Sequence, residues 1–174
     1  MVRKISGLTV LLLMVPGLIW AAELSKIGVV DFGEIVERSI AGKEIQKKIQ
    51  QKGNELKSEL ESAQVEIREL QEKFKQEAPL WSKEKREEKE GIFKAKINGF
   101  NRLKVKNEKA FNEFKAKLIN EVKTEFVSFA RKKAEKEGYL MIVEKQSGSI
   151  IYTHDSVNIT EEILTDMDKH KNTK

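Results

Sequence analysis

The most distinctive chemical feature of this sequence is a run of basic residues near its centre. Between Lys94 and Lys117 the only opposing acids are Glu108 and Glu113. The basic residues of this stripe are Lys94, Lys96, Arg102, Lys104, Lys106, Lys109, Lys115 and Lys117. A positive stripe attracts anionic partners such as acidic polypeptides, lipid phosphates or nucleic acid. For any single lysine a solvated helix face is the better interpretation, and we take the first six residues as candidate anion contacts.

No pattern in the sequence is typical of an enzyme or a metal site. His154 and His170 are the only histidines, neither has a second ligand at metal spacing, and the chain has no cysteine. Asp31 has no second acid, histidine or nucleophile beside it in a local motif, so a strand-end or helix-capping role is favoured. Ser147 and Ser149 lack the surroundings of a nucleophile. The sequence therefore predicts no catalytic residue, metal or cofactor.

The basic stripe lies in a long segment, 43–137, which predicts a helical hairpin. Charged residues make up 35% of the chain and aromatic residues 7%, a composition that suits long solvated helices better than a large core. On both sides of Pro79, apolar residues recur at helical gaps of three and four, most regularly before it, as in a coiled-coil seam. Pro79 breaks the helical ladder and Ser82 is a suitable N-cap, so we expect a turn near 78–82.

Two apolar residues, Leu80 and Trp81, would lie at the tip of this arm, where little protein covers them. Trp81 could insert into a binding partner or a membrane surface, or it could fold back on Phe74 and Leu70. The second interpretation is slightly favoured, because an aromatic side chain near a turn often packs against it. Leu80 and Trp81 are both candidate contact residues.

One layer of the predicted seam is mismatched. If the fold-back centres on Pro79 and Leu80, the apolar positions of the two helices meet, but Gly53 and Asn54 would face 104–107. That layer would be polar and weakened by its glycine. A hinge at Gly53 and an ordinary irregularity of the seam agree equally well with the sequence.

The N-terminal residues 1–22 have the pattern of a cleaved secretory signal. Arg3 and Lys4 precede the apolar run 8–20, and the small residues Ala21 and Ala22 follow it. A membrane anchor is the alternative, but the apolar run is short for a span. Cleavage would export the chain and lower its formal net charge from +5 to +3, which is 31 basic minus 28 acidic residues.

The segments that flank the arm, 23–42 and 138–174, predict a small β-rich body. They contain an expected strand in 26–32, a β-hairpin of strands 139–144 and 149–152, and short helices at 33–40 and 158–164, with a frayed tail from residue 169. The predicted fold class is thus α+β, with a long antiparallel helical-hairpin (coiled-coil) arm that projects from this body.

Such a body is too small to form a core by itself, so we expect several copies of the chain to join through it. The apolar strand residues are the candidate contacts for this association. They are Ile27, Val29, Val30, Leu140, Ile142, Ile150 and Ile151.

Short motifs on either side of the hairpin carry a resemblance to a known family. They are KIGVVDF at 26–32, AGK at 41–43, AEKEGY at 134–139, and IIY at 150–152 ahead of NITEEI at 158–163. In this order, around a charged helical hairpin, they resemble the Skp (OmpH-like) periplasmic chaperones. Each motif is weak alone, so the resemblance rests on the order of the motifs. It covers essentially the whole mature chain. Asn158 stands where the family often has Asp, which leaves helix capping intact.

The resemblance implies a homotrimer whose three arms enclose a cavity. Members of the family hold unfolded outer-membrane proteins soluble in the periplasm without ATP. The alternative function is that of a structural coiled-coil adaptor of the cell envelope, which would bind one folded partner. Contact with anionic lipid remains open, whereas nucleic acid is disfavoured as a partner because the chain has an export signal and no recognised nucleic-acid-binding motif.

Overall fold

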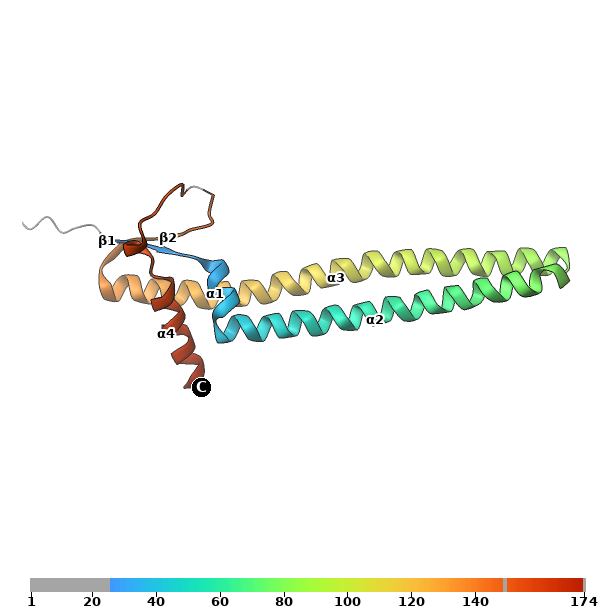
Figure 1. Cartoon of the computed structure of the whole chain (residues 1–174), viewed down its shortest axis with the longest axis horizontal. Helices are drawn as coiled ribbons and strands as arrows, with labels where there is room; N and C mark the ends of the chain where they lie inside the picture. Colours follow the sequence, from blue (N-terminus) through green and yellow to red (C-terminus); the bar gives the residue numbers. More distant parts are fainter. Residues whose placement is uncertain (1–25, 149, 174) are drawn as a thin grey trace, which may run out of the picture.

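The computed structural model of this protein describes residues 26–148 and 150–173. In chain order the elements are β1 (Lys26–Val30), α1 (Phe32–Arg38), α2 (Ile40–Glu77), η1 (Ala78–Leu80), α3 (Lys83–Glu137), β2 (Tyr139–Glu144), η2 (Asp155–Val157) and α4 (Thr160–Asn172). Figure 1 shows α2 and α3 projecting together from a small body that holds the strands, α1 and α4. The predicted α+β fold with a helical-hairpin arm is confirmed, while the predicted signal peptide lies outside the described residues.

The arm is formed by two long helices with well-defined ends. At a rise of 1.5 Å per residue, the 38 residues of α2 span roughly 57 Å and the 55 residues of α3 roughly 80 Å. The Ser82 hydroxyl caps α3 by accepting a hydrogen bond from the Lys85 N–H, and Gly138 ends the helix with a φ of 72°. The predicted turn at 78–82 is confirmed, since the 3-10 helix η1 and Ser82 fill it.

The two helices of the arm meet about one helical turn away from the predicted register. Gly53 lies against the ring of Phe111 rather than against 104–107, and Asn107 donates a hydrogen bond of 2.9 Å to the Glu59 carboxylate. The physical reason is the turn, because Ala78–Leu80 continues to wind as a 3-10 helix and moves the fold-back point toward Ser82. Asn107 is buried, so the seam contains a polar layer, but Asn107 meets Glu59 there and the layer predicted between Gly53 and 104–107 is wrong.

The body contains a two-stranded parallel sheet in place of the predicted β-hairpin. β1 pairs with β2, and α1 together with the arm forms the connection between these two strands. The strand predicted at 149–152 is wrong for its described part, because Ile150–Tyr152 forms no strand. β1 has β2 on one side and the isolated bridge from Val29 to Asn158 on the other, and residues 150–152 do not pair with the remaining edge of β2.

The core lies where α1, α4 and the sheet cover the base of α3. Ile35, Ile163 and Met167 are fully buried there, and the rings of Phe32 and Phe126 pack with their centroids 5.3 Å apart. Phe126 belongs to the buried core cluster. The base of the arm is therefore held rigidly in the body, whereas the rest of the arm extends beyond it.

The C-terminal helix α4 is longer than the sequence predicted. It runs to Asn172, through the segment that was expected to fray. Its last turns are fastened to the start of α2, because the Ile40 N–H donates to the Asp168 carboxylate over 2.9 Å and Lys171 pairs with Glu44 over 2.8 Å. The N-cap of α4 is Ile159, which makes no side-chain capping hydrogen bond. Asn158, one residue earlier, instead accepts hydrogen bonds from the N–H and the hydroxyl of Thr160.

Candidate functional site

The six candidate anion contacts all lie exposed on α3 in the projecting part of the arm. Lys96 donates a hydrogen bond of 2.7 Å to Glu66 of α2, which lowers the pKa of that carboxyl group. Lys109 approaches Glu113 to 3.9 Å within α3. The remaining four residues form no ion pair with any residue in the described part of the chain, namely Lys94, Arg102, Lys104 and Lys106. Four of the six positive charges are therefore available to a ligand.

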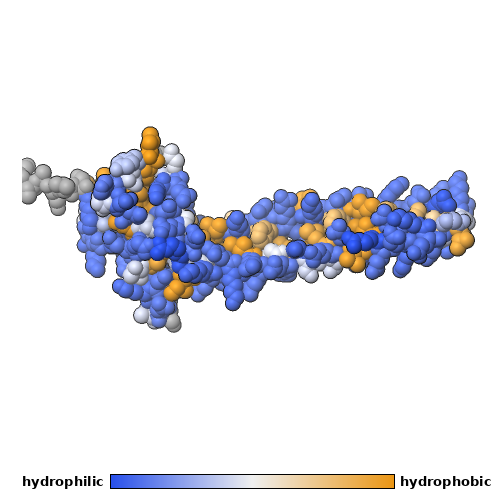
Figure 2. All heavy atoms as spheres, in the orientation of Figure 1, coloured by the Kyte–Doolittle hydropathy of each residue, from blue (hydrophilic) through white to orange (hydrophobic). Residues whose placement is uncertain are grey.

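Apolar hollows open along the seam between α2 and α3, next to these basic side chains. One hollow of about 470 Å³ is lined by Ile67, Phe100 and Leu103, and Lys96 and Glu66 also line it. Small side chains deepen it, namely Ala63, Ala95 and Gly99. Figure 2 shows the result, with hydrophobic patches alternating with hydrophilic surface along the arm. The arm thus offers apolar contact and positive charge in close alternation.

A second hollow lies nearer the body, at the polar layer of the seam. It has a volume of about 530 Å³ and is lined by Gly53, Leu60, Phe111, Lys104 and Asn107, among others. Lys104, one of the candidate contacts, therefore lies at an opening into the apolar seam. Gly53, the candidate hinge, stands inside an unbroken helix, with its backbone against the Phe111 ring.

The two apolar residues of the tip have different surroundings. Trp81 folds back, with its ring edge-on to Phe74 at a centroid distance of 5.1 Å, so the favoured prediction for this side chain is confirmed. Leu80 remains 86% exposed. The turn beneath it is held by the Arg86 guanidinium, which donates to the Ala78 carbonyl over 2.8 Å. Leu80 is therefore the exposed large apolar side chain of the tip.

The candidate oligomerisation residues fall into two groups. Val29 and Val30 are buried in the core of the single chain, while Ile142 and Ile150 are partly buried. Ile27, Leu140 and Ile151 are exposed, and Leu140 is 74% exposed. Only the exposed residues offer a free apolar surface, and they lie near the starts of β1 and β2 and in the loop after β2.

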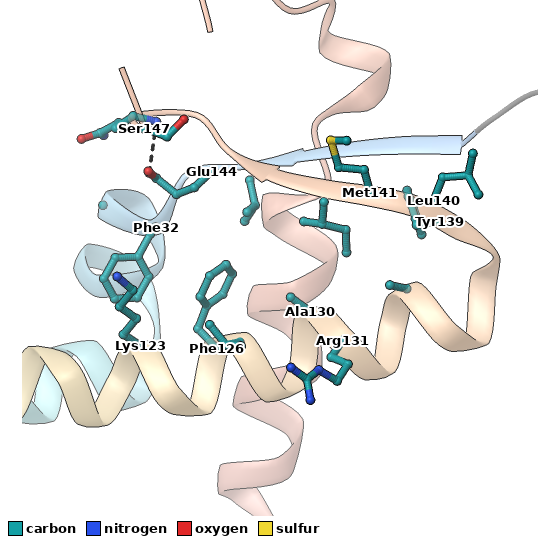
Figure 3. A pocket seen from close by; sticks show the side chains of 16 residues that line it. Phe32, Lys123, Phe126, Ala130, Arg131, Tyr139, Leu140, Met141, Glu144 and Ser147 are labelled. Carbon is teal, nitrogen blue, oxygen red and sulfur yellow. Dashed lines mark hydrogen bonds between the residues drawn. The ribbon is translucent and has the colours of Figure 1, made fainter. Parts of the chain in front are cut away.

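A cavity of about 860 Å³ opens in the body between β2 and the base of α3 (Figure 3). Phe32, Phe126 and Ala130 line its inner side, and Leu140 and Met141 lie along β2. The basic residues Lys123 and Arg131 also line it. Sequence reasoning missed the contribution of α3, Met141 and Arg131, because only the pairing of β2 with β1 brings β2 over this helix.

A buried lysine joins the end of α3 to α4. Lys133 is buried and donates hydrogen bonds of 2.6 Å to both Glu137 and Glu162. Burial by itself lowers the pKa of this lysine, but the two carboxylates outweigh that effect and raise the pKa above its usual range. The hydrogen bonds from Lys133 and Lys26 in turn lower the pKa of Glu137. This network fixes the body around the base of the arm and is not a ligand site.

Within 26–148 and 150–173, no group of three or more metal-ligating side chains comes together. Across this same part of the chain, every helix is too short or too polar to cross a membrane.

Comparison with known families identifies the arrangement. Residues 26–167 match the family described as outer membrane protein (OmpH-like), which is most of the chain and includes both strands and the entire arm. The chain belongs to the OmpH-like family. No curated protein sequence matches it significantly.

A solved structure has the same fold as this OmpH-like chain. It is the crystal structure, at 2.83 Å resolution, of a candidate outer membrane chaperone (OmpH-like) from Caulobacter crescentus CB15. The two superpose with a TM-score of 0.76 over 84% of this chain and 86% of the other, at 13% sequence identity. At that identity the likeness establishes the hairpin arm and small body as a shared fold.

Proposed function

We propose that this protein is an ATP-independent holdase chaperone of the periplasm, which binds unfolded outer-membrane proteins and prevents their aggregation. Membership of the OmpH-like family supports a chaperone role. The secretory pattern of residues 1–22 supports a location in the periplasm.

The observation that carries this proposal is the alternation of apolar hollows and free basic side chains along the arm. Unfolded outer-membrane strands alternate apolar and polar side chains. Hollows such as that around Ile67 and Phe100 would take the apolar side chains, while Lys104 and its neighbours would attract acidic ones. Each contact is weak and reversible, so we expect binding to be spread along the arm with no single decisive residue.

We further propose that three copies join at their bodies, so that three arms enclose a cavity for the client. Exposed apolar residues of the body, among them Ile27 and Leu140, support association. A sheet of two short strands is also small for an independent unit. The same basic stripe would attract anionic lipid phosphates, which makes lipid a second possible class of ligand.

The decisive experiment is a dilution assay without nucleotide. A denatured outer-membrane barrel protein is diluted from urea with and without a molar excess of the purified protein, and the aggregation of the barrel is followed by light scattering. We expect scattering to be suppressed, and suppression to persist for a second, unrelated barrel. Unchanged scattering for both barrels would contradict the proposal.

The alternative function, a structural coiled-coil adaptor of the cell envelope, predicts a different outcome. An adaptor would form a complex of fixed stoichiometry with one folded partner and would leave both barrels to aggregate. The open hollows of the seam favour the chaperone, because an adaptor that binds a single folded partner needs one continuous complementary surface.

A further inference from the structure

Three aromatic side chains form a cluster in the outer part of the arm, next to the turn. This aromatic cluster consists of Phe74 from α2, Phe93 from α3 and Trp81 from the turn between the two helices. The Phe74 ring packs edge-on against Trp81 at a centroid distance of 5.1 Å and packs tilted against Phe93 at 6.4 Å. Between residues 40 and 137, all of which the structure describes, no other two aromatic rings pack against each other.

Two hollows flank the aromatic cluster, so its rings are not enclosed. The outer hollow, of about 350 Å³, lies against Phe74 and Phe93. Its other lining residues are polar, namely Gln71, Lys75, Glu90 and Lys94. A smaller hollow of about 110 Å³ lies against the same two rings and against Trp81. Each of the three aromatic side chains remains partly exposed. A cluster that only closed the turn would be packed without such space beside its rings.

The outer hollow combines aromatic rings with polar groups that face solvent. A further ring laid against Phe74 and Phe93 gains the edge-to-face or offset contacts that aromatic rings prefer. Lys94 forms no ion pair with any residue of 26–148 or 150–173, and an ammonium group beside a bound ring adds a cation–π contact. The Glu90 carboxylate and the Gln71 amide can accept a hydrogen bond from a phenol hydroxyl or an indole N–H. The hollow therefore suits an aromatic side chain with a polar edge.

We propose that the outer hollow binds tyrosine and tryptophan side chains of unfolded outer-membrane proteins. The proposal rests on the proposed function and deepens it, because it assigns one class of client side chain to one place on the arm. Strands of outer-membrane barrels have an apolar middle that is flanked by girdles of aromatic residues at both membrane interfaces. Unfolded clients therefore present this class of side chain in many copies. The aromatic contact adds to the weak contacts elsewhere along the arm and makes none of them indispensable.

The spacing of the hollows along the arm suits an extended client. Glu90 and Lys94 line the outer hollow, and Lys104 and Glu108, two heptads further along α3, line the hollow at the polar layer. Positions two heptads apart lie on the same side of a helix, roughly 21 Å apart at 1.5 Å per residue. An extended chain covers that distance in about six residues, and its side chains alternate, so the side chain six positions on points the same way. A strand with its aromatic residue in the outer hollow would thus place an apolar residue of its middle in the second hollow.

A pair of peptides tests the preference. One is a ten-residue strand of an outer-membrane barrel with a single tyrosine, at its girdle position, and the other has leucine at that position. Each peptide carries the same fluorescent label, and its binding to the purified protein is measured by fluorescence anisotropy. We expect the tyrosine peptide to bind about 2–10-fold more tightly than the leucine peptide, which is the gain that one aromatic contact provides.

Substitutions in the arm test the place of binding. Phe93→Leu removes one ring of the outer hollow but keeps an apolar side chain in the seam. It should bring the ratio of the two affinities close to one and leave binding of the leucine peptide unchanged, which also shows that the arm stays folded. The matched control is Phe111→Leu, at another phenylalanine of α3 that lines a seam hollow, and it should keep the full preference for tyrosine. Lys94→Gln, at an exposed position, should lower the preference about two-fold through the lost cation–π contact.

The possible results separate this proposal from the proposed function. Equal affinity of the wild type for the two peptides, or binding of neither, overturns the aromatic site, while suppressed aggregation in the dilution assay would still support the chaperone. Equal loss of preference in Phe93→Leu and Phe111→Leu would mean that aromatic side chains bind anywhere along the seam. A changed number of associated chains in Phe93→Leu, with the preference intact, would mean that the hollow faces another copy of the chain. Either result overturns the proposal. A tyrosine preference without any suppression of aggregation would support the site and contradict the chaperone.

Discussion

At the scale of single residues, the junction between α1 and α2 depends on a glycine. A Cβ on Gly42 would lie 2.0 Å from the carbonyl oxygen of Val36 and 3.0 Å from the Ser39 hydroxyl, which caps α2. No side chain fits there unless the two helices move apart. The sharp turn from the body into the arm therefore requires Gly42, which lies in the first turn of α2.

We expect Gly42→Ala to destabilise the protein by about 1–3 kcal/mol, the usual cost of overpacking a tight contact. Urea denaturation measures this change in the free energy of unfolding. Gly91→Ala is the control, because no neighbouring atom lies within 4 Å of its added methyl group and the helix should gain about 0.5–1 kcal/mol. Equal changes in the free energy of unfolding for the two substitutions would show that the close contact of position 42 with Val36 does not determine the stability.

Lys133 sets the response of the body to acid. Its hydrogen bonds, followed by those of Lys26, lower the pKa of Glu137 from the ordinary value of 4.5. A carboxyl group with a lowered folded-state pKa contributes stability above its unfolded pKa and loses it as the pH falls through the folded value. The raised pKa of Lys133 keeps that lysine charged through this range, and its contribution is lost only in strong alkali.

The substitution Lys133→Met should remove about 1–2 kcal/mol of stability at pH 7, from the loss of two charge-assisted hydrogen bonds. The difference in stability between variant and wild type should shrink below pH 4.5, because the wild type also loses the network there. Urea denaturation at a series of pH values provides the measurement, and the exposed Lys136→Met serves as the control. A difference that stays constant with pH would contradict this assignment.

At the scale of elements, the sequence predicted the local features well and the distant ones poorly. Pro79 and Ser82 encode the turn within a few residues, so the hairpin was predictable. The predicted register of α2 against α3 differs from the observed one by about one helical turn. The difference arises because the backbone of Ala78–Leu80 is helical, and this depends on how Trp81 packs on Phe74.

Partners distant in sequence were harder to predict. The pairing of β1 with β2 joins residues more than a hundred positions apart, and no local pattern specifies it. For the candidate site, the exposed basic stripe was predictable from composition, whereas the hollows that accompany it depend on the observed register. The length of α4 depends on hydrogen bonds to α2, which the polar sequence of the tail does not indicate.

Gly53 in α2 is the candidate hinge of the arm, and its flexibility can be tested by substitution. The contact with Phe111 leaves room for a methyl group, since an added Cβ would lie 3.5 Å from the ring. We expect Gly53→Ala to stabilise the arm by about 0.5–1 kcal/mol and to slow hydrogen exchange of the amides on either side. Gly99→Ala, at another open helical position, is the control and should slow exchange only around itself. Unchanged exchange around Gly53 would exclude a hinge there.

At the scale of the whole molecule, the arm separates the place where clients would bind from the place where chains would join. The free basic side chains lie on the projecting part of α3, while the exposed apolar residues of the strands and the following loop lie in the body. Changes to the charge of the arm should therefore alter client capture without altering assembly. The interactions involved are exposed, so salt must weaken them.

Substitution of Lys104, Lys106 and Lys109 by Glu should weaken capture of an acidic outer-membrane protein several-fold at about 50 mM salt. The difference in affinity between variant and wild type should largely disappear near 0.5 M salt, because charges are then screened within a few ångströms. Fluorescence titration with a labelled, urea-denatured barrel measures the change. The control variant reverses Lys43, Lys47 and Lys48, which are exposed at the base of α2, and so carries the same net charge. If both variants lose capture equally, net charge governs binding. If neither does, the stripe serves solubility, and the apolar hollows hold the client alone.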